Sequence, residues 1–305
     1  MGKTLLILIA GVALSFGILS MSKDRRYLDA LDQLASQVSA YSASNAATSG
    51  AYMALNQIYL DPQWRNGYTD VELADELITV RVEDNQGDPA LDVNHLRIVS
   101  SGRNSKHTRT TRVILFDGSF KKFAIWCKEG ATNVSTKDSL GNLDASLMQQ
   151  FAPFMPRIDD AALLSMAQAQ EHVATQPVFE PASGYPNGSF YFSGATPNVT
   201  HVQGNLYLMG GRTVYGIFIV DGNATLEGSS RLRGVLYMPN PTSTIIHGGG
   251  NPSESSITGG ILTWGSVNGT GNHISVRHAP EFLRIFADGY SSSGGSIQVL
   301  SWEQN

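Results

Sequence analysis

Cysteine and charged residues are scarce in this chain. Cys127 is the one cysteine among 305 residues, so the chain can form neither an internal disulfide nor a thiolate metal cluster. The apolar neighbours of Cys127 predict a buried core thiol. Charged residues make up 15% of the chain and the formal net charge is -5, which gives no basic surplus for a nucleic acid or an anionic lipid. We therefore expect no metal, no cofactor and no nucleic-acid partner.

Helix-breaking residues are also lacking near the start. Proline is absent before Pro62, and glycine is absent between Gly17 and Gly50. The run from Leu5 to Met21 is apolar, and beyond it apolar residues recur at steps of three and four, which indicates one face of an amphipathic helix. A continuous helix from about Leu5 to Leu60 would be roughly 80 Å long. Its predicted face consists of Leu28, Leu31, Leu34 or Ala35, Val38, Tyr41, Asn45, Tyr52, Leu55 and Tyr59.

The apolar run has three interpretations. A cleavable secretory signal would have its positive start at Lys3 but lacks small residues at a cleavage site. A membrane anchor needs about 20 apolar residues, which the run nearly supplies. A packing helix must be covered by protein, and copies of the same chain offer the matching surface, which gives a fibre when they pack head to tail. The predicted assembly residues are Leu5, Leu6, Leu8, Ile9, Val12, Leu14, Phe16, Ile18 and Leu19.

The first residues, "GKTLLIL", place Gly2 before a lysine, a threonine and a leucine. With the long helix that follows, the N-terminal quarter resembles type IV pilin-like proteins, the class that includes minor pilins and pseudopilins. Ile7 stands where that family usually has an acidic residue. The resemblance implies a processing site between Gly2 and Lys3, residence in the inner membrane before assembly, a pilus-type export machinery and a helical homopolymer at the cell surface.

Three runs after the helix are rich in valine, isoleucine and threonine and are bounded by turn signals. They are "ELITVRVED", "NHLRIVSSGR" and "TRTTRVILF", and their alternation predicts an antiparallel meander. The second and third runs resemble the sheet that follows the long helix in many minor pilins, and this resemblance implies that the sheet rests on the second half of the helix and buries Tyr41, Tyr52 and Leu55. Further along, "IDDAALLSMAQAQEHVA" predicts a helix of about four turns capped by Asp159 or Asp160.

From Asn187 onward the chain consists of short strand patterns and glycine turns. The segments "GIFIV" from Gly216, "GVLYM" from Gly234 and "GILTW" from Gly260 align with one another. Repeats of roughly 20 residues predict a β-helix in which stacked coils bury an aliphatic ladder. The final "SIQVLSW" is expected to close this solenoid.

Polysaccharide enzymes often use a β-helix, but the groups for that chemistry are dispersed here. Such an enzyme would require Asp221, Glu227 or another acid to converge with a base on one solenoid face. We expect that the chain is not an enzyme. The acidic candidates are Asp221, Glu227, Glu254, Glu281 and Asp288, and the histidines, without metal-ligand spacing, are His201, His247, His273 and His278.

These patterns predict an α+β fold that is mostly β: a long N-terminal helix, a small antiparallel sheet and a C-terminal β-solenoid. The predicted domains are an assembly helix at 1–62, a sheet packed on it at 63–128, a connecting region at 129–186 and the β-helix at 187–305. The predicted function is a structural subunit of an extracellular pilus-like filament. The alternatives are a membrane-anchored adhesin that binds glycan on its β-helix and, with less support, a polysaccharide-processing enzyme. Sequons for glycosylation occur at Asn133, Asn187, Asn198, Asn223 and Asn268.

Overall fold

The computed structural model divides the chain into two compact units. The helix–sheet unit comprises Met1–Asp117 and Ile297–Asn305, and the solenoid unit comprises Gly118–Ser296. The backbone is described for residues 2–118, 120–156, 158–186, 197–248, 255–269, 273–283 and 297–305. Within these ranges side chains are described from residue 10 onward, Ser255 excepted.

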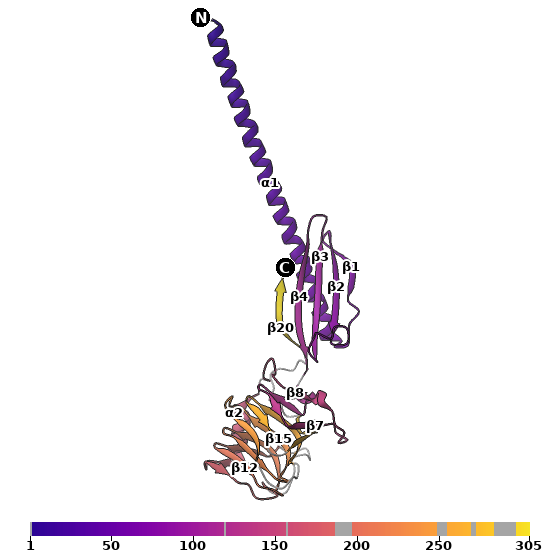
Figure 1. Cartoon of the computed structure of the whole chain (residues 1–305), viewed down its shortest axis with the longest axis vertical. Helices are drawn as coiled ribbons and strands as arrows, with labels where there is room; N and C mark the ends of the chain where they lie inside the picture. The colour runs from indigo at the N-terminus through magenta and orange to yellow at the C-terminus, as the bar shows by residue number, and fades with distance from the viewer. Residues whose placement is uncertain are drawn as a thin grey trace. The chain divides into compact units, whose positions relative to one another are not determined.

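One continuous helix and one antiparallel sheet form the helix–sheet unit (Figure 1). The helix ends just before Pro62, as predicted from the first proline of the chain. The meander of three strands is confirmed, and the sheet order is β1-β2-β3-β4-β20 with antiparallel pairing throughout. The elements are α1 (Gly2–Leu60), β1 (Tyr68–Leu73), β2 (Glu76–Asp84), β3 (His95–Arg103), β4 (Thr108–Asp117) and β20 (Ile297–Gln304).

The last strand corrects one prediction. The segment "SIQVLSW" was expected to close the solenoid, but β20 pairs with β4, with Ile297 opposite Asp117 and Gln304 opposite Thr111. Alternation along a strand predicts which face is buried and carries no information about the pairing partner. The chain therefore returns from the solenoid unit to complete the sheet that began after α1.

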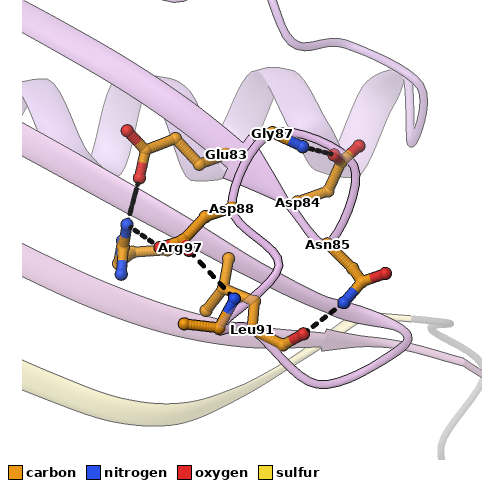
Figure 2. Close-up of polar contacts among 8 residues, drawn as sticks. Glu83, Asp84, Asn85, Gly87, Asp88, Leu91 and Arg97 are labelled. Atoms are coloured by element: carbon orange, nitrogen blue, oxygen red, sulfur yellow. Dashed lines mark hydrogen bonds and ion pairs between the residues drawn. The ribbon is translucent and has the colours of Figure 1, made fainter.

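Polar contacts fix the long connection between β2 and β3 (Figure 2). Glu83 and Arg97 are directly opposite each other in the two strands, and Arg97 Nε donates to the Glu83 carboxylate at 2.9 Å. The same guanidinium donates to Asp88 within the connection. The backbone N–H of Gly87 donates to the Asp84 carboxylate at 3.1 Å and, as the main cause, holds the pKa of Asp84 below its usual range. The turn is thus tied to the strands at both of its ends.

Parallel strands stacked in coils form the solenoid unit, which confirms the predicted β-helix (Figure 1). One sheet has the order β7-β19-β17-β15-β13-β11-β9, with β5 and β8 joined at β17, and the other has the order β10-β12-β14-β16-β18-β6. The strands of the first sheet are β5 (Ile125–Cys127), β7 (Val134–Lys137), β8 (Met148–Gln149), β9 (Val173–Ala174), β11 (Val199–Val202), β13 (Thr213–Val220), β15 (Arg231–Met238), β17 (Ser255–Thr263) and β19 (Ile274–His278). Those of the second are β6 (Ala131–Thr132), β10 (Val178–Phe179), β12 (Asn205–Leu208), β14 (Ala224–Glu227), β16 (Thr244–Gly248) and β18 (Ser266–Asn268).

Several of these strands precede Asn187, where the solenoid was expected to begin. Strands β5 to β10 lie between residues 125 and 179, and most of them have two to four residues. The run "KKFAIWC" was expected to add a strand and contains β5, but segments this short show too little periodicity to be assigned to a solenoid. Two short 3-10 helices, η1 (Phe120–Lys122) and η2 (Ala145–Leu147), lie in the same part of the chain.

The connecting region also holds the predicted helix, α2 (Asp160–Ala169). Asp159 is its N-cap, because its carboxylate accepts the backbone N–H of Ala162 at 3.0 Å. The helix is shorter than the expected four turns, since Glu171 already adopts a positive φ of 59°.

An aliphatic core runs through the coils, and Cys127 belongs to it. The cysteine is fully buried, and burial raises the pKa of its thiol to about 12. Its prediction as a core residue is confirmed.

A ladder of glycines defines the register of three coils. Gly216 pairs with Gly234, which pairs with Gly259, and all three have positive φ angles between 110° and 146°. The predicted alignment placed Gly260 in this ladder and was wrong by one residue. Gly259 and Gly260 are adjacent in the sequence, and the pattern does not show which of them has the positive φ angle.

Replacing Gly234 by alanine should destabilise the solenoid by about 2 kcal/mol or more. A Cβ at this position would lie 2.0 Å from the backbone oxygen of Gly216, and the residue would be held at a φ of 146°. Calorimetry of the full chain should show a lower unfolding temperature for the solenoid transition. Gly210→Ala is the control, because its Cβ would meet no atom closer than 3.4 Å. Equal shifts in the two variants would contradict the ladder's structural role.

Candidate assembly surface on helix α1

The first half of the described part of α1 is exposed on all sides. Every residue from 10 to 35 is exposed, whereas buried positions begin at Ala43 (Figure 1). Six large apolar side chains between Ala10 and Met21 are 50 to 73% exposed, and we call these residues the apolar segment. They are Val12, Leu14, Phe16, Ile18, Leu19 and Met21.

The remaining residues of the predicted assembly surface belong to the same helix. The side chains of Leu5, Leu6, Leu8 and Ile9 lie outside the described residues, and only their backbone is placed in α1. The same holds for Lys3 of the expected processing site, and Gly2 is the first residue of the helix. Their assembly and processing roles stay predictions.

A band of mixed charge follows the apolar segment. Residues 23 to 32 carry three basic and three acidic side chains, and all are exposed. Large apolar residues within and beyond the band are exposed as well, including Leu28 at 60% and Leu34 at 58%. This part of α1 therefore offers both apolar surface and charges of both signs to a neighbour.

The sheet does not bury the face of α1 that was predicted. Tyr41 and Tyr52 are 70 and 58% exposed, so their expected burial was wrong, while Leu55 is half-buried against the core. The buried face is composed of small residues that carry little hydrophobic signal in a search for large apolar side chains. These residues are Ala43, Ala46, Ala47, Gly50, Ala51 and Ala54, followed by Ile58.

Small residues allow the helix and the sheet to approach closely. A Cβ on Gly102 of β3 would lie 2.2 Å from the Ala43 oxygen and 2.5 Å from the Ala47 nitrogen. A Cβ on Gly50 would lie 2.4 Å from atoms of both Ile78 and Ser100. The helix and the sheet thus meet backbone to backbone at Gly102, and at Gly50 the helix backbone meets side chains of the sheet, so a side chain at either position would require its neighbours to shift.

Polar contacts hold one end of this interface. Asn104 Nδ2, in the turn between β3 and β4, donates to the Ser39 carbonyl of α1 at 2.8 Å. It also donates to Glu76 Oε1 at 3.1 Å. The amide of Asn104 therefore connects the helix to two strands of the sheet.

The strand at the C-terminus holds the other side of the helix. Tyr52 packs on Trp302 of β20 with ring centroids 4.7 Å apart, and Gln304 Nε2 donates to Thr48 Oγ1 at 2.8 Å. The aromatic residue that was expected to face the core of the sheet thus contacts its edge strand instead.

Membrane spans and metal centres are two other kinds of site. From Ala10 onward, in the ranges whose side chains are described, no helix combines enough length and apolarity to cross a membrane. In the same ranges, no three histidine, cysteine, aspartate or glutamate side chains are placed to hold a metal ion.

The candidate catalytic residues of the solenoid unit are distributed over several coils. Asp221 contacts His201 Nε2 at 2.9 Å, with the histidine side chain 12% exposed. Glu227 accepts a hydrogen bond from Tyr207 Oη at 2.6 Å, which raises the pKa of that phenol. Each carboxylate is thus bonded to a side chain of the preceding coil.

The remaining candidates are three histidines and three acidic residues. His247 is buried and His273 is exposed, while His278 Nε2 contacts the Lys121 carbonyl at 2.8 Å. Glu281 is exposed, and Glu254 and Asp288 lie outside the described residues.

The predicted glycosylation sites differ in exposure. Asn133 and Asn223 are exposed, whereas Asn198 and Asn268 are half-buried, and Asn187 lies outside the described residues. The side-chain oxygen of Asn223 accepts the backbone N–H of Thr244 at 2.8 Å. Glycosylation at these residues stays a prediction.

Comparison with known proteins gives one match. No family model matches the chain, and no curated protein matches it. A solved structure, the crystal structure of the competence-associated pilin ComZ from Thermus thermophilus, matches over 88% of this chain and 98% of that chain. The two share 11% sequence identity with a TM-score of 0.25.

Gly102→Ala should loosen the contact between α1 and the sheet. The new methyl group would meet helix backbone, which cannot move aside as a side chain can. Hydrogen exchange of the amides between Ala43 and Ile58 should become faster by about tenfold or more, corresponding to a loss of about 1.4 kcal/mol or more.

Gly87→Ala is the matched control in the same unit, because its Cβ would meet nothing closer than 3.7 Å. It should leave the exchange rates of α1 unchanged. Unchanged exchange in Gly102→Ala would show that the close approach is not needed for docking.

Proposed function

We propose that this chain is the structural subunit of an extracellular pilus-like filament that polymerises through α1. The observation that supports the proposal is the apolar segment, in which six large side chains are at least half exposed. Burying them against other copies would contribute on the order of 5–10 kcal/mol per subunit before the entropy of association is subtracted. A surface of this kind on an isolated soluble protein would promote association.

The docking of the sheet favours the same arrangement. Because the sheet covers the small-residue face of α1 from Ala43 onward, the apolar segment is left for other partners. Helix α2, with 10 residues, is too short to cover it. Equivalent helices from other copies have matching length and apolarity, and a heterologous contact between them repeats without closing and produces a fibre.

The route to the surface forms part of the proposal. The apolar N-terminal part of α1 would reside in the inner membrane before assembly, and a pilus-type export machinery would move subunits from there into the filament. The resemblance of the first residues, Gly2 to Leu8, to a pilin-like start supports this order of events.

A membrane-anchored adhesin is the second candidate. It uses the same apolar segment, which would then stay in lipid, and it displays the solenoid as a binding module. The two functions differ in the state of the extracted protein, since an anchored adhesin is monomeric in detergent and a filament subunit is recovered in polymers.

Val12→Asp should abolish filaments. Val12 is 50% exposed in the single chain and would be enclosed in the helical core of a polymer, where an unpaired carboxylate costs several kcal/mol. Electron microscopy of sheared surface material should show filaments for the unmodified chain and none for the variant at equal expression.

Gln33→Glu is the control for added charge. It introduces the same negative charge on an exposed residue of α1 beyond the apolar segment, without a change of shape. Filaments of normal number are expected. Abundant filaments from Val12→Asp would show that the apolar segment does not form the assembly contact.

A further inference from the structure

Four basic side chains gather on the outer face of the solenoid. They belong to a groove of about 450 Å³ across β15, β17, β19 and β7, which we call the basic groove. None of its described lining residues is acidic, although the chain as a whole is acidic. The lining residues are Lys137, Gly141, Arg231, Arg233, Ser256, Thr258, Ser275 and Arg277.

The strand register places these residues in two rows. In the first row, Arg233 pairs with Thr258, Thr258 with Arg277, and Arg277 with Lys137. Neighbouring strands are about 4.8 Å apart, so the row carries three cations and one hydroxyl at regular intervals along the stacking axis. In the second row, Arg231 is followed by the hydroxyls of Ser256 and Ser275.

Two of the arginines in the groove have no acidic partner in the described part of the chain. Arg231 and Arg233 are exposed and make no ion pair with any residue that the structure describes. Arg277 is oriented by the Ser139 carbonyl, which accepts from its Nε at 3.0 Å. Like charges at neighbouring positions of a sheet are destabilising, so a bound anion would relieve repulsion that the free protein contains.

We propose that the basic groove binds an acidic polysaccharide, whose carboxylate or sulfate groups lie along the row of Arg233, Arg277 and Lys137. Guanidinium groups bind such anions through paired hydrogen bonds. The serine and threonine hydroxyls beside these cations can form hydrogen bonds with the hydroxyls of the sugar rings. The length of one pyranose in an extended chain is also close to the strand spacing, which lets successive sugars meet successive coils.

A second, smaller hollow extends the groove at one end. It has a volume of about 300 Å³ and shares Arg233, Thr258 and Arg277 with the basic groove. His278 and Glu281 are added to the lining there. The part of a bound polymer that extends beyond the row of cations would therefore contact His278, which can donate hydrogen bonds, and Glu281, which can accept them.

The lining distinguishes this ligand from a nucleic acid. Sites for single-stranded nucleic acids combine basic residues with aromatic rings on which bases stack. Among the described residues, the basic groove has no aromatic lining residue, and the adjoining hollow has one, the buried Phe282. The inference does not depend on filament formation, since all of its residues belong to the solenoid unit.

The test is binding of polygalacturonate to the full chain, with neutral dextran and single-stranded DNA as comparison ligands. The double variant R233Q/R277Q should bind polygalacturonate at least about tenfold more weakly, because two charged hydrogen-bond donors to the polymer are lost. Thr258→Val, which keeps every charge, should weaken binding by a smaller factor.

The matched control is R109Q/R112Q, which removes two exposed arginines from β4 and changes the net charge equally. It should bind as the unmodified chain does. Unfolding temperatures of all variants separate loss of binding from loss of folding. R233Q/R277Q should still form filaments, and Val12→Asp should still bind polygalacturonate. These two results distinguish a failure of this inference from a failure of the proposed function.

Three results would overturn the inference. They are no binding of polygalacturonate by the unmodified chain, equal losses in R233Q/R277Q and R109Q/R112Q, and stronger binding of single-stranded DNA than of polygalacturonate. The last result would assign the groove to a nucleic acid.

Discussion

The close contact between α1 and its sheet determines what the rest of the helix–sheet unit can do. Gly102 lets the backbone of β3 meet the backbone of the helix, Gly50 makes room for side chains of the sheet, and alanines complete the face between them. Because small residues make most of this contact, the large side chains of the apolar segment are not used in folding the unit. They remain on the surface, where a helix of this length is available to other copies of the chain.

The same contact explains where prediction from the sequence succeeded and where it did not. A helix without breakers, an alternating meander and glycine-marked repeats each leave a strong local pattern, and all three elements were predicted. The buried face of α1 was not, because a search for large apolar side chains at helical spacing selects Tyr41 and Tyr52 and passes over alanine. Burial of a small residue depends on the closeness of its neighbour, which one sequence segment does not specify.

Long-range pairing caused the other differences. The sequence of β20 is compatible with an edge strand of either sheet, and its partner β4 lies far away in the sequence. The arginines of the basic groove are likewise isolated in the sequence. A correct alignment of the coils would have brought them together. Arg233 and Thr258 directly precede the ladder glycines Gly234 and Gly259. In the next coil, Arg277 pairs with Thr258. A shift of one residue at Gly260 removes this correspondence, because side chains on neighbouring positions face opposite sides of a strand.

The two units thus have different proposed roles. The helix–sheet unit provides a contact for other copies, and the solenoid unit provides a rigid ladder that holds charges at a fixed spacing. The most direct test of the account is cryo-electron microscopy of filaments isolated from the cell surface, with mass spectrometry to identify the chain. The account predicts filaments in which the apolar segments of α1 pack together in the core and the solenoids lie outside. Recovery of the chain only as a monomer in the membrane fraction, with no filament containing it, would contradict the account.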